Sequence, residues 1–187
     1  MIIALSGPSG IGKGYIKEAL KKVCSDIQEI IWYTTRDLRP DELMNSNRKH
    51  ISETEFEEMQ ANNELALTQG MFGHRYTIRK QDLLPRSGII LTEIHPYVIK
   101  EARDINPDII TFGLVTDDYE LLRDRLANRR KTESSDEIEK RVLSAKTEIE
   151  AIRKNLEFYN EIISVARDNE HLIAKIAQEM FAKYYKE

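Results

Sequence analysis

Four of the chain's eight glycines fall within one eight-residue run near the N-terminus, and this run constrains the fold more than any other feature. The run consists of Gly7, Pro8, Ser9, Gly10, Ile11, Gly12, Lys13 and Gly14. An apolar stretch at residues 2–5 precedes it and an amphipathic segment follows, so the local order is strand, turn and helix. This is the context of a phosphate-binding P-loop, in which backbone N–H groups and a helix N-terminus attract phosphate oxygens. Lys13 adds a charge that can reach the β- and γ-phosphates of a nucleotide. The alternative is a tight turn that binds nothing.

Gly14 departs from the P-loop pattern. The pattern G-x-x-x-x-G-K-[ST] places a hydroxyl directly after the lysine, and this hydroxyl normally ligates Mg²⁺. Because Mg²⁺ tolerates a largely aqueous shell, water can fill the place that Gly14 leaves. We therefore expect weaker metal affinity, and we assign no metal-ligating side chain.

Composition narrows the class of protein. The 187 residues suit one domain with room for a small inserted lobe. No run approaches the roughly 18 apolar residues of a membrane span, and the apolar N-terminus lacks the basic region of a signal peptide, so we expect no membrane partner. Cys24 is the single cysteine, which excludes an internal disulfide and favours a reducing cytoplasm. The net charge of −4 argues against general nucleic-acid binding.

Hydrophobic periodicity predicts alternating strands and helices. Strands are expected at 2–5, 28–35, in short pieces within 65–78, and at 88–94, 109–115 and 161–165. Helices are expected after the glycine-rich run, at 53–62, at 117–130, from about 138 onward and after 172. Ser52 and Glu55 form a capping-box signature, and the polar stretch 36–50 is predicted to be a loop. The alternation indicates an α/β fold with a parallel sheet covered by helices on both faces.

Arg36 and Arg39 lie three residues apart in this predicted loop. Two guanidinium groups at that spacing can converge on one dianionic phosphate. Alone, the pair is better explained as two solvated surface arginines. Beside a P-loop the phosphate-binding interpretation is favoured, because phosphoryl transfer needs an acceptor held as firmly as the donor.

A second basic cluster lies around Arg125 and Arg129, which are four residues apart and so share a helix face. Arg141 follows after an acidic segment. A flexible basic segment that closes over a triphosphate would exclude water and neutralise charge in the transition state. A solvated helix face paired with acidic neighbours is the alternative interpretation.

Two further side chains are candidates for the site. Glu93 lies near the carboxyl end of the strand at 88–94, where ligands gather in α/β sheets, and could orient Mg²⁺ through water or contact the acceptor. Tyr76 could donate its hydroxyl to a phosphate or simply pack. The four histidines show no metal-ligand spacing, and Ser9 has no patterned partners for a hydrolase triad.

The glycine-rich run, the segment Tyr33-Thr34-Thr35-Arg36-x-x-Arg39, Glu42 and the 125–141 segment together resemble guanylate kinase. The resemblance extends over roughly 160 residues, and the TTRxxR element is far more specific than the P-loop. It implies a core at 1–33, 83–125 and 141–187, a lobe for the nucleoside monophosphate at 34–82 and a helical lid at 126–140. It implies ATP with Mg²⁺ as the donor at residues 7–14, and small-molecule substrates as the partners of a monomer or homodimer.

The same resemblance assigns roles to individual side chains. It implies that Arg36, Arg39 and Tyr76 hold the acceptor phosphate. It further implies that four cationic residues, with Arg36, form the catalytic set: Lys13, Arg125, Arg129 and Arg141.

Several positions depart from the guanylate kinase pattern. Tyr33 stands where a serine is usual, and we keep it among the acceptor-binding residues together with Glu93. Arg48 replaces a phosphate-binding tyrosine and can still bind phosphate. Leu67 occupies the position of the glutamate that reads the guanine edge, and a pocket that loses a polar partner loses discrimination. The phosphate-handling parts are therefore better supported than the guanine-reading parts.

Two other interpretations stay open at this point. The segments 48–52 and 65–67 look similar to ribose 1,5-bisphosphate phosphokinase, which also lacks the hydroxyl after the P-loop lysine, although Arg39 favours the guanylate kinases. Guanylate-kinase-like domains also serve as non-catalytic binding modules, against which Lys13 and the basic clusters argue. The sequence predicts an ATP-dependent nucleoside monophosphate kinase with GMP as its acceptor.

Overall fold

The computed structural model describes residues 1–38, 42–43, 47–71, 73–85, 87–129, 134–167 and 173–185, which contain nine strands and six α-helices. The strands are β1 (Ile2–Ser6), β2 (Gln28–Glu29), β3 (Trp32–Thr34), β4 (Arg48–His50), β5 (Leu65–Met71), β6 (His74–Arg79), β7 (Ile90–Glu93), β8 (Ile110–Val115) and β9 (Glu161–Ser164). The helices are α1 (Lys13–Val23), α2 (Glu53–Ala61), α3 (Ile99–Ile105), α4 (Tyr119–Arg129), α5 (Ser135–Lys154) and α6 (Ile173–Tyr184). Short 3₁₀ turns include η2 (Lys80–Leu83), η3 (Pro96–Val98) and η4 (Leu156–Phe158).

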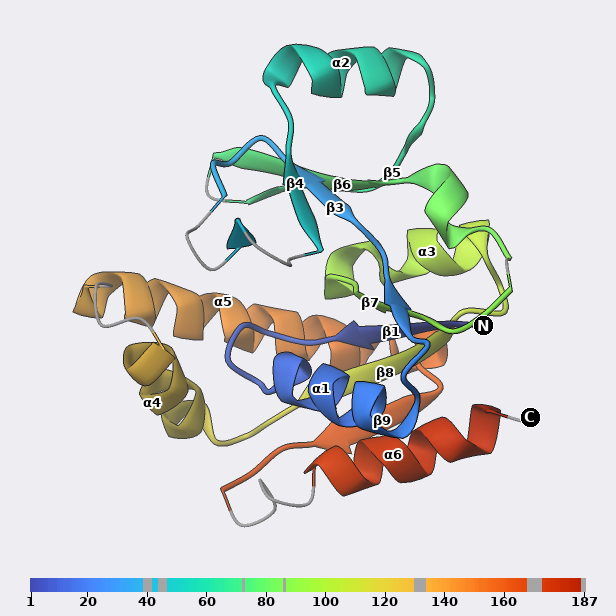
Figure 1. Cartoon of the computed structure of the whole chain (residues 1–187). Helices are drawn as coiled ribbons and strands as arrows, with labels where there is room; N and C mark the ends of the chain where they lie inside the picture. The colour runs from blue at the N-terminus through green and yellow to red at the C-terminus, as the bar shows by residue number, and fades with distance from the viewer. Residues whose placement is uncertain are drawn as a thin grey trace.

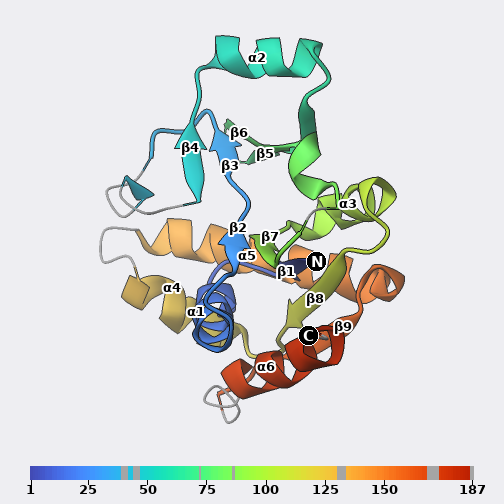
Figure 2. The ribbon, with the colours of Figure 1, turned by 45° about the vertical axis from the view of Figure 1, so that its right-hand side comes forward.

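Five strands form a parallel sheet in the order β2-β7-β1-β8-β9, which we call the large sheet. Its central strand β1 is buried along its whole length, as expected of a strand that is covered on both faces. Helices α1 and α6 pack against one another on one side of this sheet, and α3 and α5 lie on the other (Figures 1 and 2). The predicted three-layer α/β architecture is confirmed.

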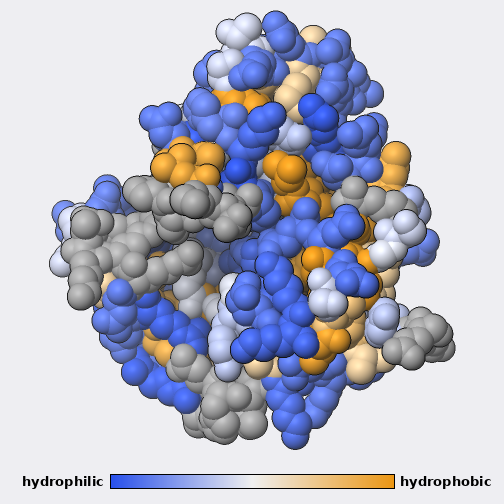
Figure 3. All heavy atoms as spheres, in the orientation of Figure 1, coloured by the Kyte–Doolittle hydropathy of each residue, from blue (hydrophilic) through white to orange (hydrophobic). Residues whose placement is uncertain are grey.

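Four strands form a second sheet in the order β4-β3-β6-β5, which we call the small sheet. It stands above the large sheet in Figure 1, and α2 covers its outer face. The capping box at the start of α2 is present, since Ser52 accepts a hydrogen bond from the Glu55 backbone and the Glu55 carboxylate accepts one from the Ser52 backbone. Hydrophilic residues dominate the surface around α2 in Figure 3.

Two predictions about the first third of the chain are wrong. The strand expected at 28–35 is divided, because β2 pairs with β7 in the large sheet whereas β3 pairs with β4 and β6 in the small sheet. The chain crosses between the sheets at residues 30–31, within an unbroken apolar run that conceals the change of sheet. The loop expected at 36–50 ends early, because residues 48–50 form β4 beside β3.

Within the described residues, no helix combines the length and apolar character needed to cross a membrane.

Candidate functional site

The glycine-rich loop joins the carboxyl end of β1 to the first residue of α1. Gly7, Gly10 and Gly12 have φ values of 153°, 84° and 115°, which side-chain-bearing residues rarely adopt. At Gly7 a Cβ would also lie 2.8 Å from the Leu114 backbone oxygen, so the loop can pass this close to β8 only without a side chain. Ile11 is fully buried and anchors the middle of the loop in the core.

The start of α1 is an open anion-binding position. Gly12 is the N-cap of the helix and provides no side-chain cap, so the first backbone N–H groups of α1 are left for another acceptor. The Lys13 ammonium lies over the loop and donates hydrogen bonds to the Gly7 and Pro8 carbonyl oxygens at 2.7 and 3.0 Å. An anion seated at the helix end would therefore meet both amide dipoles and a positive charge.

Arg125, from α4, contacts two backbone carbonyl groups of the same loop. Its Nη1 atom donates to the Gly10 and Ile11 carbonyl oxygens at 3.1 and 2.9 Å. The structure thus brings Arg125 to the predicted phosphate-binding loop across more than a hundred residues of sequence. In this arrangement the guanidinium group holds two loop carbonyls in place.

Glu93, at the carboxyl end of β7, faces the start of α1. Its Oε2 atom lies 3.8 Å from Lys13 Nζ, and its Oε1 atom lies 3.1 Å from Lys17 Nζ. Burial disfavours the ionised form of Glu93, but the charges of Lys13 and Lys17 outweigh it and lower the pKa of Glu93 to about 2. The carboxylate is therefore charged at neutral pH.

A second cationic cluster lies on the small sheet. Arg36 follows β3, and its Nε atom donates to the Tyr76 hydroxyl of β6 at 3.3 Å. Its Nη2 atom donates to Glu42 Oε2 at 2.6 Å, and Arg48 Nε lies 3.4 Å from the other Glu42 oxygen. Burial disfavours the charged form of Arg36, but its bonds to Glu42 and Tyr76 outweigh this and raise its pKa. Arg36 and Arg48 thus share the Glu42 carboxylate, and the Tyr76 hydroxyl contacts Arg36 beside it.

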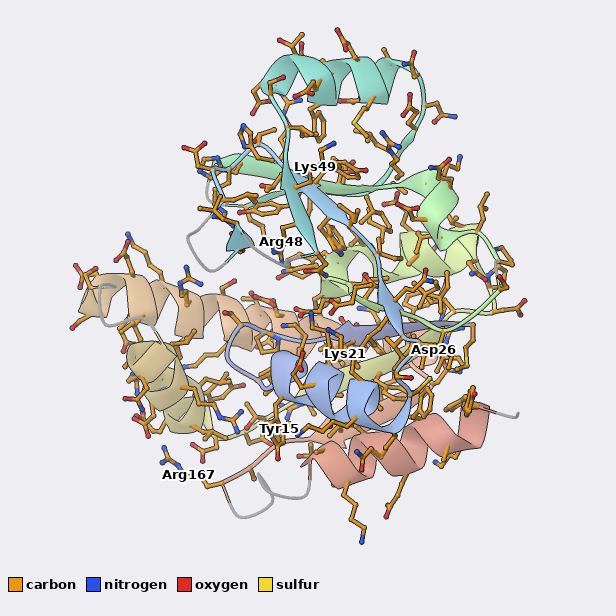
Figure 4. All side chains as sticks on the ribbon, viewed as in Figure 1. Tyr15, Lys21, Asp26, Arg48, Lys49 and Arg167 are labelled. Carbon is orange, nitrogen blue, oxygen red and sulfur yellow. The ribbon has the colours of Figure 1, made fainter. Side chains whose placement is uncertain are left out.

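Arg48 connects the two clusters electrostatically. It lies on β4 above α1, as Figure 4 shows, and its charge contributes to lowering the pKa of Glu93. Glu93 is thus influenced both by Lys13 at the glycine-rich loop and by Arg48 on the small sheet. This arrangement can hold two anionic groups in one region, one at each cluster.

Tyr33 is not brought to this cluster. Neighbouring residues of a strand face opposite sides, and it is Thr34 that pairs with Tyr76. The Tyr33 ring is buried with Ile51 and Phe56 beneath α2. The position therefore contributes to the packing of the small sheet on its outer side.

Three other predicted residues are placed less fully. Arg39 lies outside the described residues. Arg129 is the last residue of α4, and its side chain lies outside the described part of the structure. Arg141 is half-buried on α5, where its charge adds to the effect of hydrogen bonds from Ser134 in lowering the pKa of Glu137. The roles of these arginines stay predictions.

The Leu67 side chain has no polar atom that could form a hydrogen bond with an acceptor. Its side chain is fully buried in the core, and its backbone has a φ of 54° at an irregularity in the β5–β6 pairing. The Leu67 N–H donates to Glu101 Oε1 of α3 at 2.8 Å. The backbone amide at this position is therefore engaged as well.

Sequence reasoning missed two sets of titratable residues next to the site. His95 Nε2 lies 3.5 Å from Glu148 Oε2 of α5, a carboxylate that is only 8% exposed. Lys17 contacts Glu93 and also Glu29, the second at 2.8 Å. The four-residue spacing of Lys13 and Lys17 places both on one helix face and was the available signal for Lys17. No local pattern points to the His95–Glu148 pair.

Comparison with known proteins gives a consistent result. The chain is 32% identical over 153 residues to the guanylate kinase of Lactobacillus johnsonii, covering 80% of this chain and 74% of that protein. It is 29% identical over 186 residues to the guanylate kinase of Caldanaerobacter subterraneus, covering 98% and 87%. The crystal structure of guanylate kinase from Anaplasma phagocytophilum superposes with a TM-score of 0.69 at 20% identity, covering all of this chain and 87% of that one. No protein-family model matches the chain.

Fold and sequence likeness together define a phosphotransferase of the nucleoside monophosphate kinase class. Within that class, the chain belongs to the guanylate kinase family.

Proposed function

We propose that this protein transfers the γ-phosphate of ATP to GMP, giving ADP and GDP, in the cytoplasm. The observation that carries the proposal is the presence of two cationic clusters, each of which holds a residue whose charge lowers the pKa of Glu93. One is the glycine-rich loop with Lys13, and the other is the Arg36–Tyr76–Arg48 group. Two phosphate-bearing substrates have to be held together for direct transfer, and two such clusters meet that requirement.

On the donor side, the free N–H groups at the start of α1 would receive the phosphates of ATP, and Lys13 would exchange its loop carbonyls for phosphate oxygens. Arg125 would keep the loop carbonyls turned away from the nucleotide. This would leave the loop N–H groups facing the phosphates. Arg129, Arg141 and the predicted lid would add positive charge and exclude water.

The residues present fit a Mg²⁺ ion that arrives with ATP. Among the described residues, no three His, Cys, Asp or Glu side chains gather as a metal site, so the ion would be held mainly by phosphate and water. A Cβ built on Gly14 meets no atom within 4 Å, which leaves space for water there. The ionised Glu93, held beside the loop by Lys17, would orient that shell through water. When bound, the ion supplies charge neutralisation for the transferring phosphoryl group.

On the acceptor side, Arg36, Tyr76 and Arg48 would bind the phosphate of GMP, which would take over bonds now made to Glu42; the same role is proposed for Arg39. An oxygen of that phosphate then attacks the γ-phosphorus of ATP, and the bond from the γ-phosphorus to the ADP oxygen breaks. The step needs no covalent enzyme intermediate. Positioning and electrostatic stabilisation supply the acceleration.

The position of Leu67 supports a second candidate acceptor. Leu67 is buried in the core and offers no polar side-chain atom to a base. A site that lacks one hydrogen-bonding partner distinguishes less between guanine and other groups. Ribose 1,5-bisphosphate, which has phosphates but no base, is therefore the second candidate acceptor.

The test is a coupled assay of ADP release with GMP, dGMP, AMP, UMP and ribose 1,5-bisphosphate. We expect GMP to be the best nucleotide acceptor. Turnover of ribose 1,5-bisphosphate alone would establish the second candidate, and an absence of turnover with every acceptor would overturn the proposal.

Arg36→Met provides the matching mutational test. We expect kcat/KM for GMP to fall about 100-fold, because charge-assisted hydrogen bonds each contribute about 1.5–3 kcal/mol, while the KM for ATP changes little. Arg153→Met is the control, since Arg153 is an exposed arginine of α5 whose guanidinium pairs with Asp117. Equal losses in the two variants would argue against a role for Arg36 in acceptor binding.

A further inference from the structure

Three lysines at four-residue intervals line one face of α1 and alternate with two carboxylates. Lys17 Nζ lies between Glu29 Oε2 at 2.8 Å and Glu93 Oε1 at 3.1 Å. Lys21 Nζ lies 2.6 Å from the other oxygen of Glu29, and Lys13 Nζ lies 3.8 Å from the other oxygen of Glu93. Figure 4 shows Lys21 on α1, farther along the helix from the glycine-rich loop.

The strand register explains this arrangement. Glu29 is paired with Leu91 across β2 and β7, and Glu93 lies two residues beyond Leu91. Residues two apart on a strand share a face, so both carboxylates project from the same side of the large sheet, toward α1. Residues four apart on a helix also share a face. The two periodicities place the five charges in one line.

The central lysine is well shielded from solvent. The Lys17 side chain is 13% exposed, compared with 36% for Lys21. Burial disfavours its charged form, but the charges and hydrogen bonds of Glu93 and Glu29 outweigh burial and raise the pKa of Lys17. Lys17 is therefore a fixed positive charge at neutral pH.

The hydrogen bonds differ between the three lysines in a way that bears on ATP. Lys17 and Lys21 donate to Glu29, whereas Lys13 donates to the carbonyl oxygens of Gly7 and Pro8. Glu93 thus makes its short contact with Lys17 and only a longer one with Lys13. The carboxylate is satisfied without drawing Lys13 out of the loop.

We propose that Lys17 is a positioning residue for the donor site, holding Glu93 so that Lys13 stays available to the phosphates of ATP. The inference rests on the proposed function in that ATP is taken as the ligand of the loop. Without Lys17, Glu93 would lose its 3.1 Å contact and keep Lys13, now 3.8 Å away, as its remaining partner on α1. The Glu93 side chain is 28% exposed, and the attraction between two opposite charges is stronger where less water screens it. Lys13 would then move closer to Glu93 and compete poorly for phosphate.

The experiment measures binding of Mg²⁺·ATP to the full chain by calorimetry in a set of variants. Lys17→Met should raise the Kd about tenfold, a size typical of coupled charged neighbours. Lys17→Arg keeps the charge and should stay within about threefold of the unchanged protein. Lys21→Met removes a lysine from the same helix face that does not contact Glu93, and should change the Kd less than about twofold.

The decisive variant combines Lys17→Met with Glu93→Gln. A neutral amide no longer captures Lys13, so the double variant should bind ATP about as tightly as Glu93→Gln alone. A purely structural role for Lys17 predicts the opposite, since the double variant still lacks the lysine. A double variant that binds ATP clearly more weakly than Glu93→Gln alone, or an unchanged Kd in Lys17→Met, would overturn the proposal. A lack of GMP turnover by the unchanged protein would overturn the proposed acceptor without altering these ATP-binding results.

Discussion

The large sheet and the small sheet stabilise their functional groups in different ways. The glycine-rich loop leaves a central strand whose residues are at most 3% exposed, and Ile11 anchors it in the main core. Among the described residues, the outer side of the small sheet has a cluster of three buried residues beneath α2, namely Tyr33, Ile51 and Phe56. The loop is therefore built on a thick apolar scaffold. The inner side of the small sheet, with Tyr76 and Ile78, packs into the same main core, whereas its outer side rests on the small cluster alone.

Cations compensate in part for the thin packing of the small sheet. The Arg75 guanidinium lies 4.7 Å from the centre of the Phe56 ring, and the Arg79 guanidinium lies 5.4 Å from that of Tyr33. Each contact combines cation–π attraction with coverage of apolar surface by the arginine stem. The comparison indicates that α2 and the outer side of the small sheet are the part that can loosen without loss of the main core, which is useful near a site that must admit a substrate.

Matched truncations in the two sheets test this contrast most strongly. Phe112 and Phe56 are both at most 1% exposed, one on β8 and the other on α2. Phe112→Ala should lower the free energy of unfolding of the whole protein by about 3–5 kcal/mol, as measured by denaturant titration. Phe56→Ala should speed hydrogen exchange in β3–β6 selectively and raise the KM for GMP more than the KM for ATP. Uniform loss of protection across both sheets in Phe56→Ala would show that the two sheets unfold as one unit.

Lys13→Ala tests whether Lys13 contributes to catalysis rather than to the stability of the fold. We expect kcat/KM to fall about 10²–10³-fold, the usual effect of removing one group that stabilises developing charge, with little change in melting temperature. Lys22→Ala, at an exposed position of the same helix, is the control in the coupled assay and in thermal unfolding. A large loss of stability in Lys13→Ala would instead make its bonds to Gly7 and Pro8 structural.

The large sheet was predictable because its signals are local. A strand, a glycine-rich turn and a helix follow one another within the first 23 residues. The start of α2 on the small sheet was predictable for the same reason, because Ser52 and Glu55 form a local capping box. The crossing at residues 30–31 was not predictable in this way. Apolar residues there satisfy either sheet equally well, and the pairing of β3 with β4 and β6 decides which sheet the chain joins.

The parts of the candidate site also differ in how well the sequence alone predicts them. The glycine-rich loop is encoded in consecutive residues, so its members could be named from the sequence. The meeting of Arg36 with Tyr76 depends on a strand pairing across 40 residues and was reached through the family resemblance. The resemblance gave a wrong prediction for Tyr33. Side chains alternate between the two faces of a strand, so the Tyr33 side chain faces away from Tyr76. Lys17 escaped notice because its partners come from two other strands.

Gly14 offers the finest test of the donor side, because the backbone at this position accepts a side chain. It lies in the first turn of α1, and a Cβ there meets no atom within 4 Å. Gly14→Ser and Gly14→Ala should both stabilise the helix by about 0.5–1 kcal/mol, since glycine is the poorer helix former. Only the serine hydroxyl can add a ligand for Mg²⁺, so Gly14→Ser alone should lower the Mg²⁺ concentration for half-maximal activity, by about threefold. Comparison with Gly14→Ala separates the effect of the hydroxyl from the effect of replacing glycine in the helix. Identical metal titrations of the two variants would mean that water already replaces the hydroxyl fully, and that the donor side lost no metal affinity when glycine took this position.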